Sequence, residues 1–476
     1  MSLIHSIKWI GLSQLIKITA QIVSIFYLTR LISPEEYGLL AMTTIVMNLA
    51  YIFSDMGTGA AIVQKQNISI NFYSFIYRLN IIIGIIVMLF IFLFTPIIVN
   101  YFERDELFNL LYLIALVFPI ACLGIVHKSK IEKEQKFKTL AKIEIFANVS
   151  GVLVAILLAN MGFGVYSIVF QILLVALLTT VLYKSNSKLK LKLMQKSNRE
   201  DFNHFLSFSG NLFLFNLINY FSRNLDMMLI GKFFSASILG AYSVAYRIML
   251  FPVQSMTFVV SRALLPHMAN DLLNIEKIKR SYLKCIFLIT MISSPLMLGI
   301  SALSNDFVSL FFTKNWNYLS IVLVWLAPSA IIQCVLSTSG AVFTAYEKTN
   351  WLFYLGCIST LLYTSAFYIG VQYNIEVFVK LYLMANVLNF LPVMLLVGKI
   401  LNFSLNEVIF NILKVMIPAI IMFVFLKILN QYFDGISFYY FSIKILSGIL
   451  VYLAFLYTFN IQMFQEFFIK INQSRK

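Results

Sequence analysis

Charged side chains are scarce in this sequence. Asp, Glu, Lys and Arg make up 12% of the 476 residues, whereas hydrophobic residues make up 60%. A water-soluble domain of this length cannot hide so much apolar surface, so the composition excludes a soluble globular protein. Apolar stretches of about 20 residues recur from end to end, and a helix of that length crosses a bilayer core of about 30 Å. We therefore expect an all-α, polytopic membrane protein.

Cysteine and histidine are rare as well, with four of each. The cysteines are scattered through apolar stretches without metal-ligand spacing, so we interpret them as small buried hydrophobic residues. The histidines, among them His127, lie near expected cytoplasmic helix ends, and we interpret them as interfacial polar residues. The sequence also lacks a Walker loop, a nucleophile elbow and any region large enough for an ATPase domain. It predicts neither an enzyme nor a cofactor, so energy must come from an ion gradient or from the substrate.

Positive charge is concentrated in two segments, 128–142 and 184–199, within a chain of net charge +16. Nucleic-acid binding would need a basic face on a folded domain, which a chain of this composition does not offer. The positive-inside rule instead places both segments in the cytoplasm, with both chain ends on that side (N-in/C-in). We expect about fourteen transmembrane helices. Their ranges are 9–30, 38–64, 76–100, 107–127, 143–160, 163–183, 205–231, 236–262, 282–303, 317–344, 351–372, 375–398, 407–429 and 437–460.

The chain resembles itself at a constant offset of 202 residues. Segment 30–38 matches segment 232–240 in its basic residue, its serine and its glycine, and segment 61–63 matches 263–265 at the same offset. Such parallel repeats are common in transporters, where the substrate path lies between the halves. We therefore expect a six-helix lobe over 1–200, a second six-helix lobe over 201–400, and two additional helices with a cytoplasmic tail over 401–476.

Polar side chains form a helical stripe in the first expected span and in its repeat mate, the seventh. The two stripes are Gln14, Lys17, Gln21 and Ser24, and, each 202 positions later, Asn216, Asn219, Arg223 and Asp226. Charged residues inside spans usually face a cavity, because exposure to lipid is costly. We expect the stripes to face each other across a central, substrate-binding cavity. The alternative is that they mediate polar packing between helices.

Three further charged residues lie in or near expected spans. Arg247 in the eighth span is a further candidate for substrate binding, and Arg78 is a candidate phosphate contact or an interfacial anchor. Asp55 is a candidate site for H⁺ or Na⁺ coupling, or else a partner of Lys17 or Arg223.

Several short patterns, in a fixed order, carry a family resemblance. They are Leu28-Thr-Arg30, segment 34–39 (Pro-Glu-Glu-Tyr-Gly-Leu), segment 55–62 (Asp-x-Gly-x-Gly-Ala-Ala-Ile), segment 136–141, and the run from Asn224 to Pro252. Together they resemble Wzx-type O-antigen and polysaccharide flippases over about the first 270 residues. The resemblance implies the multidrug/oligosaccharidyl-lipid/polysaccharide exporter superfamily, with two six-helix lobes around a central cavity.

The resemblance further implies the export of undecaprenyl-diphosphate-linked repeat units across the bacterial inner membrane by alternating access. The partners to expect are that lipid-linked glycan, membrane lipids, and polysaccharide polymerase and chain-length proteins, but no nucleic acid. A lipid II flippase and a cation-coupled drug antiporter of the same superfamily remain alternatives. A membrane enzyme, either a glycosyltransferase or an O-antigen polymerase, also remains an alternative. Such enzymes usually need larger outer loops than this chain has.

Overall fold

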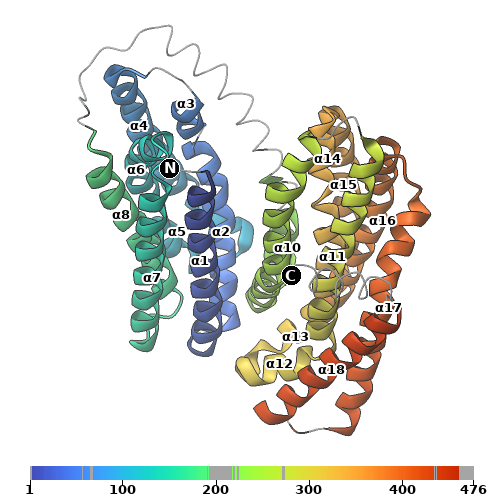
Figure 1. The fold of residues 1–476 in the computed structure, drawn as a ribbon. Coiled ribbons are helices and arrows are strands. Elements are labelled where there is room, and N and C mark those ends of the chain that lie inside the picture. The colour runs from blue at the N-terminus through green and yellow to red at the C-terminus, as the bar shows by residue number, and fades with distance from the viewer. Residues whose placement is uncertain are drawn as a thin grey trace. The chain divides into compact units, whose positions relative to one another are not determined.

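The computed structural model describes residues 3–55, 57–64, 68–189, 191, 217, 220, 221, 224–270, 274–433, 435 and 437–459. Throughout these residues the regular structure is helical, as the composition predicts. The chain divides into two compact units, Met1–Gly240 and Ala241–Lys476, called unit 1 and unit 2 (Figure 1). In the described part, thirteen helices are long and apolar enough to cross a membrane. The remaining expected span, 205–231, falls mostly outside it, so the count of fourteen and the orientation stay predictions.

The described part of unit 1 is built from long helices and two short ones, α3 and α5. They are α1 (Leu3–Leu31), α2 (Pro34–Asp55), α3 (Thr58–Gln64), α4 (Ile70–Phe102), α5 (Leu107–Ala115), α6 (Val117–Lys133), α7 (Phe137–Asn160) and α8 (Tyr166–Ser187). A further helical segment covers 224–233 and precedes the first turn of α10. In unit 1, α7 packs against both α1 and α8, and α6 packs against α4 and α8 (Figure 1).

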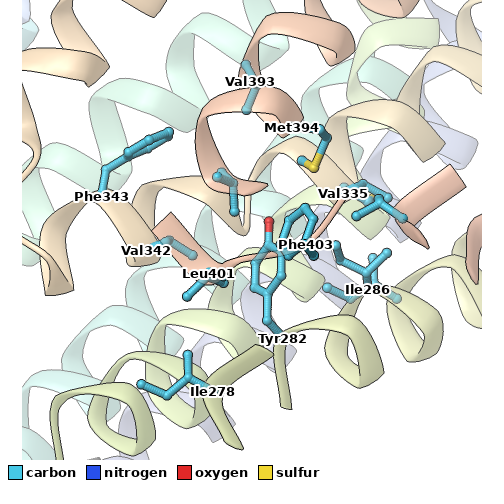
Figure 2. Close-up of a cluster of buried hydrophobic side chains, with 14 of the residues drawn as sticks. Ile278, Tyr282, Ile286, Val335, Val342, Phe343, Val393, Met394, Leu401 and Phe403 are labelled. Atoms are coloured by element: carbon cyan, nitrogen blue, oxygen red, sulfur yellow. The ribbon is translucent and has the colours of Figure 1, made fainter. Parts of the chain in front are cut away.

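Unit 2 holds the rest of α10 (Ala236–Asn270). It continues with α11 (Ile275–Ala302), α12 (Ser304–Phe311), α13 (Asn317–Leu336), α14 (Ser339–Ala345), α15 (Thr349–Gly370), α16 (Ile375–Leu401), α17 (Leu405–Tyr432) and α18 (Phe438–Phe459). A hydrophobic cluster forms where α11 begins and α16 ends (Figure 2). There the rings of Tyr282 and Phe403 stack with centroids 5.9 Å apart, and the Tyr282 hydroxyl lies 2.9 Å from Thr338 Oγ1.

The 202-residue offset is visible in the local structure of two helix starts. Helix α2 begins at Pro34 and α10 at Ala236, and each follows an N-cap serine. Ser33 Oγ accepts a hydrogen bond from the Glu36 amide at 3.2 Å, and Ser235 Oγ accepts one from the Ile238 amide at 3.3 Å. Both caps satisfy an otherwise orphan amide of the first turn. The division into 1–200, 201–400 and 401–476 itself stays a prediction.

The same two helix starts touch through their glycines. A Cβ atom on Gly38 would lie 1.9 Å from the carbonyl oxygen of Ala236, and one on Gly240 would lie 1.9 Å from that of Pro34. The two contacts are reciprocal, since each glycine meets the helix-start residue of the other repeat. Only glycine permits this approach, because any other side chain would overlap a backbone oxygen.

Contacts within unit 1 join turns that the predicted topology places on one side of the membrane. On the expected outer side, Glu36 accepts from the Val165 amide at 3.0 Å, and Lys232 donates to Glu103 at 2.7 Å. On the expected inner side, Lys133 donates to the Ile62 carbonyl at 3.3 Å. These contacts are consistent with spans that alternate in direction along the chain.

One sequence-based expectation differs from the structure in burial. His127 is 1% exposed, and its Nδ1 lies 2.6 Å from Ser187 Oγ, so it is buried within the protein, and its place at the membrane interface stays a prediction. Helix α6, which carries it, is covered by α8. Cys122 and Cys334 are buried as expected, whereas Cys357 on α15 is exposed.

Candidate functional site

The residues of the polar stripe on α1 differ in burial. Gln14 and Gln21 are exposed, whereas Ser24 is buried. Lys17 lies between the exposed and the buried side of α1. Helix α1 packs along α7, and the Lys17 side chain is directed towards α7. Helix α1 thus presents two uncovered amides and one partly covered ammonium group along a length of otherwise apolar surface.

Lys17 forms an ion pair with Glu144 of α7. The same carboxylate lies 3.4 Å from Ser13 Oγ of α1 and 3.4 Å from the Tyr183 hydroxyl of α8. The Lys17 and Glu144 side chains are 29% and 24% exposed. The four residues Ser13, Lys17, Glu144 and Tyr183, called the Glu144 cluster below, therefore tie three helices together and remain open on one side.

Glu144 is a residue that the sequence did not single out. The expected span began at 143, which placed Glu144 at a helix end where an acidic side chain is unremarkable. In the structure α7 begins at Phe137, so Glu144 lies two turns inside the helix, at the start of its apolar part. There its carboxylate pairs with the ammonium group of Lys17 from α1. The sequence offered one indication of this ion pair: a lysine and a glutamate lie inside expected spans of the same lobe.

The other predicted site residues are placed as follows. Asp226 is buried, and its Oδ1 accepts a hydrogen bond from the Met227 amide at 2.8 Å. Arg78 on α4 and Arg247 on α10 are partly buried. Asn216, Asn219 and Arg223 lie outside the described residues, as does the side chain of Asp55. The central cavity between the two stripes therefore stays a prediction.

Unit 2 contains a polar network that the sequence also did not single out. The Gln333 side chain donates to the Tyr382 hydroxyl at 2.8 Å, and the Tyr363 hydroxyl donates to Asn386 Oδ1 at 3.1 Å. Ser359 Oγ donates to Asn389 Oδ1 at 2.8 Å. These bonds link α13, α15 and α16 through amides and hydroxyls, the usual means of polar packing between membrane helices. Among the described residues, no group of three or more His, Cys, Asp or Glu side chains is arranged to hold a metal ion.

The sequence is similar to known proteins along most of its length. Residues 27–321 match the family described as "Polysaccharide biosynthesis protein". The chain is 28% identical over 409 residues to the teichuronic acid biosynthesis protein TuaB of Bacillus subtilis (strain 168), covering 86% of this chain and 84% of TuaB. It is 26% identical over 380 residues to the lipopolysaccharide biosynthesis protein WzxC of Escherichia coli (strain K12), covering 78% and 75% of the two chains. The predicted resemblance to Wzx-type proteins is thereby confirmed.

Solved structures show the same fold. The lipid II flippase MurJ in its inward closed conformation superposes with a TM-score of 0.76 over 97% of this chain and 100% of that chain, at 19% identity. A multidrug resistance transporter of the MATE family, in an inward-facing conformation, superposes with a TM-score of 0.61 over 84% and 99%, at 16% identity. The chain is a multi-pass inner-membrane transporter, not an enzyme, and it belongs to the polysaccharide biosynthesis protein family.

Proposed function

We propose that this protein flips an undecaprenyl-diphosphate-linked oligosaccharide, the repeat unit of a surface polysaccharide, across the bacterial inner membrane by alternating access. The observation that carries the proposal is the uncovered polar face of α1, with exposed Gln14 and Gln21 beside partly exposed Lys17. Amides and an ammonium group facing lipid would lose their hydrogen bonds with water, so this face is better explained by a hydrated substrate path.

The chemistry of this face suits such a substrate. Glutamine amides donate and accept hydrogen bonds, as sugar hydroxyls require, and a lysine binds phosphate as a compact positive charge. With the cell interior negative, outward movement of an anionic phosphate is favoured by about 2.3 kcal/mol per charge per 100 mV. Relatives of this chain are named for polysaccharide biosynthesis, among them the succinoglycan biosynthesis transport protein ExoT of Rhizobium meliloti (strain 1021), 24% identical over 340 residues.

A lipid II flippase and a cation-coupled drug antiporter share this fold and are the competing functions. An antiporter of cationic drugs would need an acidic binding face, whereas the described face of α1 carries a lysine and two neutral amides. Coupling to H⁺ or Na⁺, binding of membrane lipids, and contact with polysaccharide polymerase and chain-length proteins belong to the same proposal.

The test is deletion of the gene in its host, followed by measurement of surface polysaccharide and of the leaflet that holds the lipid-linked units. We expect surface polymer to disappear while single units accumulate in the inner leaflet. Complementation with wild type restores export, and complementation with Lys17→Ala or Arg223→Ala does not, when export is normalised to the level of each protein in the membrane. Gln372→Ala, in the turn after α15, is the control and complements fully. Units that reach the outer leaflet normally in the deletion strain would overturn the proposal.

A further inference from the structure

The lysines of the basic segment 128–142 differ in how their charge is compensated. Three of them form ion pairs inside the segment: Lys128 with Glu132, Lys130 with Glu134 and Lys136 with Glu134, at 3.6, 2.9 and 2.7 Å. Lys138 and Lys142 of α7 are exposed, and neither pairs with a carboxylate among the residues that the structure describes. These two ammonium groups are therefore open to an anion from outside the protein.

Lys138 and Lys142 lie at the start of an exposed apolar stripe on α7. The stripe continues with Phe146, Val149, Leu153 and Leu157, which are all exposed. Steps of three and four residues place all six side chains on one face of the helix. At 3.6 residues per turn, Phe146 lies about 160° around the helix axis from Glu144. The stripe therefore lies on the side of α7 away from the Glu144 cluster, through which α7 meets α1.

The polarity of this face changes along the helix as it does along a phospholipid. The Lys138 ammonium lies 5.3 Å from the centre of the Trp9 ring of α1. Tryptophan is enriched at the membrane–water boundary, so this contact indicates the level of the lipid headgroups. Lys142 lies about 6 Å further along the helix axis, and Phe146 about 6 Å beyond that. Two positive charges are thus followed by apolar surface that faces the bilayer.

We propose that this face of α7, consisting of Lys138, Lys142 and the apolar stripe, binds an anionic glycerophospholipid of the leaflet on the expected inner side. The lipid phosphate accepts hydrogen bonds from both ammonium groups, and an acyl chain lies along the stripe. A soluble acidic protein would leave the stripe uncovered, whereas a phospholipid covers both parts of the face. Because Lys138 also contacts Trp9, the bound lipid holds the start of α1 against α7.

This site is separate from the substrate face of the proposed function, which lies on α1. The experiment is a titration of the full-length protein with phosphatidylglycerol or phosphatidylethanolamine of the same acyl chains, followed by native mass spectrometry. We expect wild type to bind phosphatidylglycerol more tightly. Each lysine near an anionic lipid contributes about a fivefold change in affinity, so Lys138→Gln/Lys142→Gln should weaken phosphatidylglycerol binding about 25-fold. Its binding of phosphatidylethanolamine should change little.

The matched control is Lys128→Gln/Lys136→Gln, which removes the same charge from two lysines that already have carboxylate partners. It should bind phosphatidylglycerol within about twofold of wild type, since its lysines lie outside the proposed face. Lys138→Arg/Lys142→Arg keeps both charges and should bind as wild type does, even if the glutamine variant fails to fold.

Three results would overturn the proposal. Equal losses in the two glutamine variants would mean that binding follows net charge and not this face. Equal affinities of wild type for the two phospholipids would show that the headgroup charge is not recognised. The third is binding of undecaprenyl phosphate, but not of phosphatidylglycerol, that depends on Lys138 and Lys142. That result would assign the face to the transported lipid. All three leave the flippase proposal intact, because export is tested separately by gene deletion.

Discussion

The ammonium group of Lys444 lies 2.7 Å from Oδ2 of Asp306, and the two side chains are only 3% and 14% exposed. Lys444 also donates to the Phe433 carbonyl at 3.0 Å and to the Asn430 side chain. These bonds join α18 to α12 and to the end of α17. Because the charge is buried and fully partnered, it holds the last two helices against the rest of unit 2.

Replacing Lys444 with Met should therefore destabilise unit 2. The substitution leaves Asp306 buried without its counter-ion, and loss of one member of a buried ion pair costs about 3–5 kcal/mol. The measurement is the thermal unfolding midpoint of the purified protein. Lys427→Met, at a partly buried lysine on α17, is the control and should change little. The double variant Lys444→Met/Asp306→Leu removes both charges and should recover much of the loss; equal midpoints for single and double variants would contradict this account.

Alanine at Gly38 or Gly240 should disrupt the contact between the first turns of α2 and α10. The new methyl group would overlap a backbone oxygen, which cannot rotate away as a side chain can. Overpacking of this kind costs about 1–3 kcal/mol. Gly356→Ala is the control, because a Cβ there meets nothing within 4 Å and α15 is helical at that position. Export and thermal stability should fall for Gly38→Ala and Gly240→Ala and should be kept by the control.

Much of the fold could be predicted because its signals are local. An apolar stretch long enough to span a bilayer is read directly from the chain, and so are the N-cap serines Ser33 and Ser235. The repeat offset follows from the same residues, because the two helix starts have the same capping pattern. Helix boundaries were less accurate, since amphipathic ends such as 137–143 extend a helix beyond its apolar core.

Charge pairs between helices could not be predicted. Lys17 and Glu144 are 127 residues apart, and Lys444 and Asp306 are 138 apart. Which helices become neighbours depends on packing across the whole unit, and a single sequence carries no local signal for it. The stripe on α1 was found by its helical period, yet its division into exposed amides and a paired lysine depends on α7, which the period does not reveal.

The ion pair between Glu103 and Lys232 should contribute to stability only above acidic pH. The hydrogen bond from Lys232 holds the pKa of Glu103 below its ordinary value, with the charge of Lys232 acting in the same direction. A lowered folded-state pKa stabilises the protein above the unfolded-state pKa of about 4.3, and that contribution is lost as the pH falls through the folded-state pKa. The difference in thermal midpoint between wild type and Glu103→Gln should be constant near neutral pH and vanish in acid. A difference that grows on acidification would contradict the assignment.

Lys17 has two roles, one in the stability of the fold and one in transport. A double-variant experiment should distinguish them. Lys17→Met leaves the Glu144 carboxylate in a span without its counter-ion, so the level of the protein in the membrane should fall. Adding Glu144→Gln removes that unpaired charge and should restore the level, with a coupling of about 1–3 kcal/mol between the two sites. Export should nevertheless stay absent in the double variant, because no ammonium group remains to bind the diphosphate. Quantitative immunoblotting of membranes, together with surface polysaccharide measurement, distinguishes the two effects. Recovery of export along with protein level would mean that Lys17 serves only to pack α1 against α7.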